Sequence, residues 1–202
     1  MSSPNDSAAG KQLFKSAFLE KITRTHISIP LIMYYGLSVF LIYFALNKGL
    51  DIMTVAQSWI IGFLSFTLLE YTAHRKLFHM LTNTKAKEKV QYGLHGVHHD
   101  YPRDKDRLAM PPFMSIILAT GFYYLYTLLM GDFGITFCGG FLAGYATYLA
   151  VHYTVHAFRP PNNFFSILWT HHSYHHYKDH TRAFGVSSPL WDVIFRTMPK
   201  KD

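Results

Sequence analysis

The chain has 202 residues, a length typical of one domain; half of them are hydrophobic although the mean hydropathy is only +0.07, so apolar and polar residues must be segregated into blocks. The single cysteine, Cys138, excludes an intramolecular disulfide and a metal site built on cysteine. The formal net charge of +7 would suit a nucleic acid, but the basic residues are distributed as in a membrane protein, so we expect a lipid bilayer and no nucleic acid as partner.

Residues 1–28 are expected to form a tail and a short interfacial helix. Residues 1–10 are rich in Ser, Asn, Asp, Pro and Gly, which predicts disorder, and they lack the layout of a signal peptide, so the first spanning segment must direct insertion. Residues 11–24 place several apolar side chains on one helical face with lysines around them, namely Leu13, Phe14, Ala17, Phe18 and Ile22. A helix in the membrane interface and a helix packed on the rest of the protein fit this pattern equally well.

Four runs without Asp, Glu, Lys or Arg follow, and each is about long enough to cross a hydrocarbon core. They are residues 31–46, 52–69, 113–130 and 133–151. Buried helices of a soluble protein are the alternative, but uncharged runs of this length are uncommon outside bilayers. Short links predict two hairpins, within residues 29–70 and 111–151, and glycines in the last run allow close helix contact, namely Gly139, Gly140 and Gly144.

Ten of the 13 histidines fall into four clusters between and after these runs. The clusters are His74 and His79; His95, His98 and His99; His152 and His156; and His172, His175 and His176. Residues three or four apart share a helical face, whereas His98 and His99 are about 100° apart and can face different metal ions. His74 and His79 would be about 140° apart on a continuous α-helix, so we expect that helix to end between them. His26, His171 and His180 are left over.

The distribution of charge predicts the topology. If both termini lie on one side of the membrane, that side holds every lysine and arginine except Lys48, together with all the histidines. By the positive-inside rule this side is cytoplasmic. We therefore expect an all-α integral membrane protein of one domain with four transmembrane helices in two hairpins. Residues 71–110 and 152–202 would form a cytosolic helical cap that holds a histidine-rich di-metal site.

Glu70 and residues 184–197, at and within the expected cap, also suggest structural roles. Glu70 stands one helical turn before His74, where its carboxylate orients that histidine, balances metal charge or only marks the end of the helix. Residues 184–197 are apolar and aromatic, which favours a lid or a segment that packs at the interface.

The number of imidazoles limits the chemistry. Ten are more than one four-coordinate structural zinc can use, but they suit two ions, and neutral nitrogen ligands suit iron, which can activate oxygen. A site at the membrane surface above many aromatic residues indicates a lipid substrate, so the pattern predicts a membrane oxygenase or desaturase. A membrane metal-binding or transport protein is less consistent with the sequence, since transport needs polar ligands at bilayer depth and the four runs contain no histidine before His152.

The motifs resemble those of the fatty acid hydroxylase/sterol desaturase superfamily. Its histidine pattern is similar to His74-Arg-Lys-Leu-Phe-His79, His95-Gly-Val-His-His99, His152-Tyr-Thr-Val-His156 and His172-Ser-Tyr-His-His176. Other motifs look like the fatty acid 2-hydroxylase (ceramide hydroxylase) branch: Glu70-Tyr71 before His74, the run from His98 through Pro102, Asp104 and Arg107 to Pro112, and Phe184-Gly-Val-Ser-Ser-Pro-Leu-Trp-Asp192.

This resemblance implies a hydroxylase that uses O2 and two electrons to place a hydroxyl group on carbon 2 of a fatty acyl chain, free or within a ceramide. It implies two metal ions, with iron in the active enzyme and zinc possible in purified protein. The implied ligands are His74, His79, His95, His98, His99, His152, His156, His172, His175 and His176. Tyr148 is implied on the substrate side; relatives often have aspartate after this tyrosine, where this chain has Leu149. A sterol or carotenoid hydroxylase or desaturase of the same superfamily is the alternative.

The resemblance also implies partners and a location. The first thirty residues are too short for the fused haem domain that eukaryotic members often carry, so a separate donor is expected, a b-type cytochrome or a ferredoxin with its reductase. It would dock on the basic cytoplasmic surface. The membrane is that of the endoplasmic reticulum in a eukaryote or the cytoplasmic membrane in a bacterium.

Overall fold

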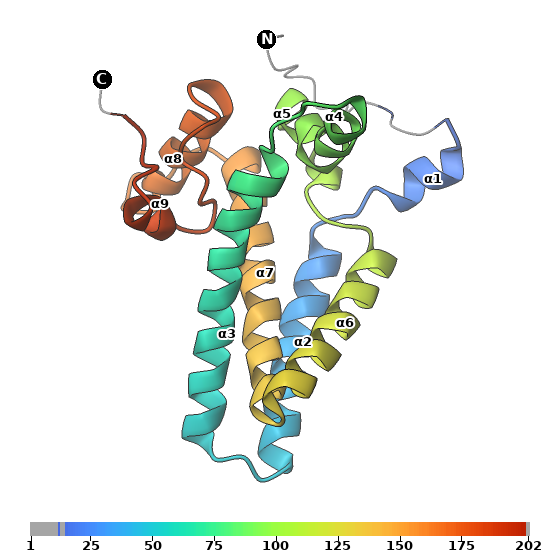
Figure 1. The fold of residues 1–202 in the computed structure, drawn as a ribbon, viewed down its shortest axis with the longest axis vertical. Helices are drawn as coiled ribbons and strands as arrows, with labels where there is room; N and C mark the ends of the chain where they lie inside the picture. Colours follow the sequence, from blue (N-terminus) through green and yellow to red (C-terminus); the bar gives the residue numbers. More distant parts are fainter. Residues whose placement is uncertain (1–11, 13–14, 201–202) are drawn as a thin grey trace.

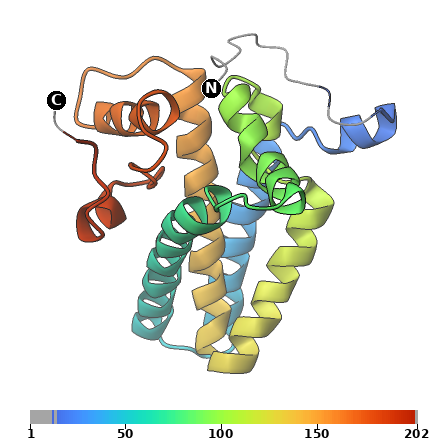
Figure 2. The ribbon, with the colours of Figure 1, turned by 45° about the horizontal axis from the view of Figure 1, so that its top comes forward.

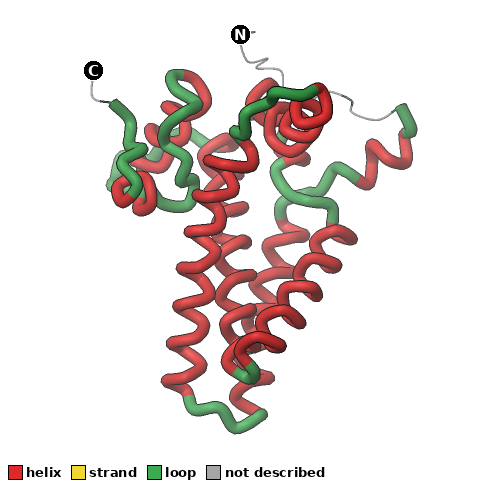
Figure 3. Tube along the Cα trace, in the orientation of Figure 1, coloured by secondary structure: helices red, strands yellow, loops and turns green. Residues whose placement is uncertain are grey.

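The computed structural model describes residue 12 and residues 15–200. Among these residues all regular structure is helical and no strand occurs (Figure 3), which confirms the expected all-α class. The tail predicted to be disordered lies outside the described residues, as do Leu13 and Phe14 of the predicted interfacial face.

Four helices are long and apolar enough to cross a membrane. They are α2 (Ser28–Asn47), α3 (Ile52–Ala73), α6 (Pro112–Met130) and α7 (Phe133–Ala157), as the four uncharged runs predicted. Helix α7 lies among the other three (Figures 1 and 2), and 72% of its most apolar window is buried, against 28% or less in each of the others. The apolar outer faces of α2, α3 and α6 are therefore left for lipid.

Two short turns connect these helices at the same end of the bundle. Asp51 caps the N-terminus of α3, where its carboxylate accepts the N–H groups of Met53 and Thr54, both at 3.0 Å. Gly131 provides the positive φ, 59°, that the α6–α7 turn requires. Lys48 of the first turn forms an ion pair with Asp132 of the second, which fastens the two hairpins together.

Glycines bring α3 and α7 into close contact, as the sequence predicted. A Cβ atom added to Gly140 would lie 1.9 Å from the carbonyl oxygen of Trp59, and one added to Gly62 would lie 2.0 Å from that of Phe137. Only glycine fits at these two crossing points, so both helices are held at a fixed distance below the cap.

The remaining elements form a cap at the other end of the bundle (Figure 1). Along the chain they are the π-helical turn η1 (His74–Phe78), α4 (Lys85–Gln91), a second π-helical turn η2 (Tyr92–Gly96), α5 (Val97–Asp100), the 3₁₀ turn η3 (Lys105–Arg107), α8 (Ser166–Tyr177) and α9 (Leu190–Ile194). Because α3 and α7 run directly into it, the cap is tied rigidly to the bundle.

Helix α1 (Ala17–Ile22) lies beside the cap. Phe18 is exposed, as an interfacial helix requires, while Glu20 pairs with Arg107 and Arg24 pairs with Asp104 at 3.2 Å. The segment thus combines an exposed apolar side chain with polar contacts to the cap, so it has features of both expected arrangements.

Candidate metal centre

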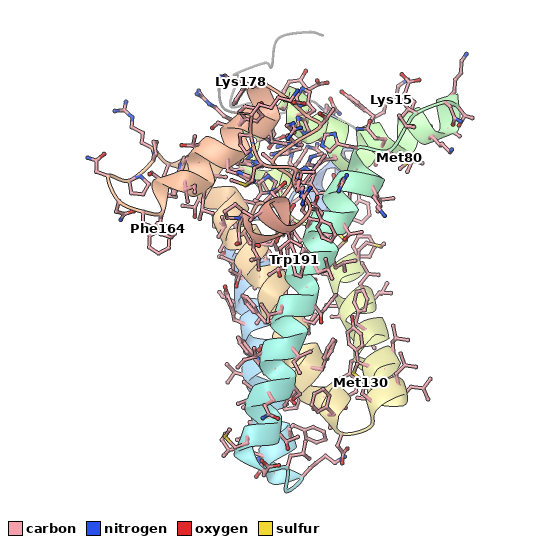
Figure 4. All side chains as sticks on the ribbon, turned by 60° about the vertical axis from the view of Figure 1, so that its left-hand side comes forward. Lys15, Met80, Met130, Phe164, Lys178 and Trp191 are labelled. Atoms are coloured by element: carbon pink, nitrogen blue, oxygen red, sulfur yellow. The ribbon has the colours of Figure 1, made fainter. Side chains whose placement is uncertain are left out.

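The ten histidines of the four clusters meet in the cap as two groups of five. The first group is His74, His79, His95, His99 and His175, and the second group is His98, His152, His156, His172 and His176. Within each group one ring nitrogen of every histidine lies within 4.8 Å of those of the other four. Figure 4 shows many nitrogen atoms inside the cap, at the end of the bundle opposite to Met130, the last residue of α6.

Helical spacing distributes the histidines of α8 and of the η2–α5 segment between the groups. His95 and His99, four residues apart, face the first group, and His98 faces the second. On α8 the assignment is reversed, since His172 and His176 face the second group and His175 the first. The prediction that His98 and His99 face different sites is therefore confirmed.

A π-helical turn brings His74 and His79 together. The helix does end between them, at Phe78, but its last turn, His74–Phe78, is wider than an α-helical one, and the N–H of His79 donates to the carbonyl oxygen of His74 at 3.2 Å. Bonding five residues apart brings the two rings to a centroid distance of 5.2 Å, which an α-helical end alone would not do. Nothing in the sequence indicated this turn.

Two imidazoles of the first group are oriented by backbone carbonyls. His74 donates its Nδ1–H to the carbonyl oxygen of Phe184, and His175 donates its own to that of Arg182 at 2.8 Å. The Nε2 atoms must then present lone pairs to the centre, where Nε2 of His74 is 3.0 Å from that of His95 and Nε2 of His175 is 2.9 Å from that of His79. Lone pairs that His74 and His175 direct to the same centre suit a bound cation.

The second group contains several buried nitrogens without a hydrogen-bond partner. Nε2 of His98 is 2.9 Å from that of His152, and Nε2 of His156 is 2.8 Å from that of His172. Among the described residues nothing bonds to Nδ1 of His152 or His172, or to either ring nitrogen of His176. Buried polar atoms are rarely left unpaired, so the ring nitrogens of His176 fit a bound cation, whereas Nδ1 of His152 and of His172 lies on the side of the ring away from the centre.

Burial keeps the imidazoles in the neutral form that binds metals. It lowers the pKa of His79 to about 4 and that of His175 to about 3. Burial first, and then the neighbouring imidazoles, also lower the pKa of His95, His98 and His172 far below the ordinary value. Neutral nitrogen donors gathered in this way are suited to a first-row transition metal.

Residues 182–197, which we call the C-terminal brace, hold the first group from behind. The carboxylate of Asp192 accepts the N–H groups of Phe184 and Gly185 at 2.9 and 2.7 Å, the hydroxyl of Thr197 at 2.6 Å and Nε2–H of His171 at 2.9 Å. Burial raises the pKa of Asp192, but these four donors outweigh burial, and the net pKa is lowered.

The lid predicted for residues 184–197 was wrong. Phe184 and Val186 are almost fully buried inside the cap, because the chain there must bring its carbonyl groups to the histidines. Exposed apolar side chains lie on α9 and directly after it, namely Leu190, Val193, Ile194 and Phe195, so packing at the membrane interface stays a prediction for that part of the chain.

Glu70 fixes the brace to α3. Its carboxylate accepts the N–H groups of Val186 at 2.7 Å and Ser187 at 2.9 Å, and the hydroxyl of Ser187 as well. Since Phe184 lies two residues before Val186 and bonds to His74, Glu70 orients that histidine through the brace rather than by direct contact. Of the interpretations of Glu70, the orienting one is therefore supported.

A cavity of about 590 Å³ begins beneath the histidines and extends into the bundle between α3, α6 and α7. At its cap end it is lined by polar groups, namely Glu70, His74, His95, His98, Tyr148 and His152. Farther down its walls are apolar, with Phe66, Phe122 and Phe141 among them. Such a space suits a long apolar molecule whose one end lies beside the imidazoles.

The sequence of this chain matches known proteins over most of its length. A sequence model of the fatty acid hydroxylase family, described as "Fatty acid hydroxylase", matches residues 59–197, which include all ten histidines of the two groups. The chain belongs to the fatty acid hydroxylase family. The expected resemblance to this family is thereby confirmed.

Two curated members of the family are similar to this chain. It is 37% identical to a ceramide very long chain fatty acid hydroxylase of Schizosaccharomyces pombe, over 89% of this chain and 53% of that protein. It is 36% identical to a dihydroceramide fatty acyl 2-hydroxylase of Arabidopsis thaliana, over 94% of this chain and 81% of that protein. The chain thus spans about half of the fission yeast relative and about four fifths of the plant one.

The fold is also similar to that of a solved family member. The structure described as full-length scs7p, with only the hydroxylase domain visible, superposes with a TM-score of 0.85 at 32% identity, covering 95% of this chain and 73% of that one. A fatty acid hydroxylase fold with four candidate spanning helices and a histidine-rich cap is therefore established for this chain.

Tyr148 and Leu149 occupy different surroundings in this member of the fatty acid hydroxylase family. Tyr148 lines the cavity, and its ring centroid is 5.3 Å from that of His152. Leu149 is fully buried and packs with Ile27 and Ala109. The position after Tyr148 is therefore an apolar contact in this chain.

The three leftover histidines have different environments. His26 is exposed and contacts Ser28 at 2.8 Å, so it remains outside the site. His171 is a buried positioning residue that the spacing argument missed, although it directly precedes His172 and its partner Asp192 ends a motif of the family. His180 lies at the edge of the first group, with its ring centroid 4.9 Å from that of His99.

Proposed function

We propose that this protein is a membrane monooxygenase that hydroxylates carbon 2 of a fatty acyl chain, free or within a ceramide. The observation that carries this proposal is the convergence of ten buried histidines on two points at the head of an apolar cavity. The curated relatives named above are described as ceramide or dihydroceramide acyl hydroxylases, which supports the same substrate class.

The two histidine groups would each hold one metal ion, with iron in the active enzyme and zinc possible after purification. The expected ligands are the ten histidines predicted from the sequence. When bound, iron supplies the activation of O2 and the redox capacity that side chains lack. The reaction balances as one C–H group, O2, two electrons and two protons giving C–OH and water.

The protein's own residues would bind and align the acyl chain. The apolar walls between α3, α6 and α7 take up the chain and exclude water, which leaves carbon 2 near the cap end. Tyr148, beside His152 at the cavity head, is placed to contact the carbonyl end of the substrate through its hydroxyl group. Glu70 and Asp192 act as positioning residues, because they hold the brace that orients His74 and His175.

The electrons would come from a separate protein, a b-type cytochrome or a ferredoxin with its reductase. The cap presents exposed basic side chains, among them Arg75, Lys76, Lys85, Lys87 and Lys89. A donor with an acidic surface would be attracted to this face.

The same charges support the proposed orientation. Every described lysine and arginine except Lys48 belongs to the cap end of the chain, which the positive-inside rule places in the cytoplasm. We propose an integral multi-pass protein with cytoplasmic termini, in the endoplasmic reticulum of a eukaryote or in the cytoplasmic membrane of a bacterium.

The test is lipid mass spectrometry of cells that produce the protein, combined with metal analysis of the purified chain. We expect 2-hydroxy acyl lipids to accumulate with the wild type and with His26→Ala, a control in which an exposed histidine is lost. His98→Ala should insert into the membrane, lose metal and form no product. Oxidised sterols or carotenoids without 2-hydroxy acyl lipids would indicate the alternative activity, and product from His98→Ala would contradict the site.

A further inference from the structure

A second cavity, of about 490 Å³, lies between α2 and α6 and is lined almost entirely by apolar side chains. Met33, Leu37 and Phe40 contribute from α2, and Ile116 and Tyr123 from α6. It contains no histidine, so it belongs to neither metal site.

Two residues border both cavities. Ala119 of α6 and Leu142 of α7 line the cavity below the histidines on one side and the α2–α6 cavity on the other. Both are almost fully buried. They therefore form a partition between the two spaces, to which Ala119 contributes a methyl group and Leu142 an isobutyl group.

This partition lies at the deep end of the first cavity. On α7, Leu142 is ten residues from His152, which at the helical rise corresponds to about 15 Å. The other deep wall is thicker, since Phe141 packs against Phe66 and Phe122 with ring centroids 5.2 and 4.9 Å apart. A molecule that outgrows the first cavity thus meets aromatic rings on one side and only Ala119 and Leu142 on the other.

The first cavity has a limited volume, about 590 Å³, and the polar head of the substrate takes part of that space. The end of an acyl chain that reaches the deep wall therefore meets the partition.

We propose that Ala119 and Leu142 are specificity-determining residues that set the longest acyl chain the enzyme accepts. The partition stops the chain end at the deep wall of the first cavity, and the α2–α6 cavity is the space that becomes available when the partition is opened. This inference rests on the proposed function, because it assumes that the first cavity holds the acyl chain.

The experiment uses the full chain with both metals, in nanodiscs, supplied with a donor system and an equimolar series of ceramides with acyl chains of graded length. Leu142→Ala opens the partition, so the product profile should shift to longer chains. Ala119→Leu adds bulk to the deep end, so the profile should shift to shorter chains. Since one methylene group in an apolar pocket changes kcat/KM by about 10-fold or more, each shift should change the long-to-short product ratio at least that much.

Two control variants lie at residues that line only the α2–α6 cavity; Leu41 matches Leu142 in size and burial, whereas Thr120 is exposed. Leu41→Ala removes the same volume from the same buried cluster but borders only the α2–α6 cavity, and Thr120→Leu adds bulk only there. Both should leave the profile unchanged. If Thr120→Leu shifted the products to shorter acyl chains, the chain would already enter the second cavity and the proposal would be wrong. Unchanged product profiles in both Leu142→Ala and Ala119→Leu would also contradict it.

The same experiment distinguishes a failure of the proposed function from a failure of this inference. If the wild type forms no 2-hydroxy product from any ceramide or free acid, the function is wrong. If it forms product but the ratio of chain lengths does not respond to either partition variant, only this inference is wrong. Should Leu142→Ala fail to fold, Ala119→Leu still decides the matter.

Discussion

Nε2–H of His171 donates to Oδ2 of Asp192 at 2.9 Å, and neither side chain reaches solvent. The bond joins α8, which carries three histidines of the two groups, to the brace that holds the carbonyl groups of Phe184 and Arg182. Because one carboxylate also accepts two backbone N–H groups and the hydroxyl of Thr197, four donors of the cap depend on it.

The first prediction concerns Asp192→Asn. Asparagine keeps the size of aspartate but replaces one acceptor oxygen with an NH2 group, which would face a donor. We expect a loss of roughly 3 kcal/mol in stability, since buried donors without partners cost about 1–3 kcal/mol each. Metal at the first histidine group should fall while the protein remains in the membrane.

Thermal unfolding in detergent and metal content per chain would test this prediction. Asp179→Asn is the matched control, because Asp179 accepts from Thr181 on an exposed turn and its loss should cost less than about 1 kcal/mol. Equal stability and metal content in both variants would show that Asp192 is not needed to hold the brace.

The second prediction concerns the crossing of α3 and α7. Gly140→Ala would place a methyl group 1.9 Å from the carbonyl oxygen of Trp59, so the helices must separate. Overpacking of this kind costs about 1–3 kcal/mol, and unfolding in detergent should report it. Gly36→Ala on α2 is the control, since nothing lies within 4 Å of its Cβ position, and its stability should stay within about 1 kcal/mol of the wild type.

Much of this architecture could be predicted because it depends on local regularity. Uncharged runs predicted the spanning helices, and α-helical spacing placed His98 and His99 in different groups. Each of these inferences uses residues within a few turns of one helix. Where the backbone left the α-helical pattern, at the His74–Phe78 turn, the wider winding had no signal in the sequence.

The brace and the cavity could not be predicted for another reason. Glu70 meets Ser187 across 117 positions of the chain, and His171 meets Asp192 across 21, so both contacts depend on tertiary packing. The cavity depends on how α6 leans away from α3 at the cap end, an angle that no local pattern specifies (Figure 1). Periodicity therefore identified the histidines but not what holds them.

The third prediction is a pH dependence of the metal-free protein. In the unfolded chain histidine has a pKa of about 6.5, whereas burial lowers that of His79 to about 4 and that of His175 to about 3. Unfolding therefore takes up protons below about pH 6.5, and stability is lost as the pH falls toward these lower values.

Each buried histidine contributes a slope of up to about 1.4 kcal/mol per pH unit. The midpoint of thermal unfolding of the chelated protein should fall steeply as the pH is lowered from about 7 to about 5. The metal-loaded protein should hold its midpoint to lower pH, because bound ions keep the imidazoles unprotonated. A flat profile without metal would mean that these histidines are solvated in the native state.

The last prediction is that the two ions differ in affinity. His74 and His175 of the first group donate Nδ1–H to carbonyl groups, while among the described residues Nδ1 of His152 and of His172 in the second group has no partner. Such outer bonds orient a ligand and raise its basicity, and losing them costs about 10–100-fold in metal affinity. A chelator titration followed by metal analysis should therefore remove one ion well before the other.

Two variants assign the ions to the groups, because each loses a ligand of a single group. His79→Gln should keep the weakly held ion of the second group, and His156→Gln should keep the tightly held ion of the first. Removal of both ions in one step from the wild type would show that the carbonyl bonds do not distinguish the sites.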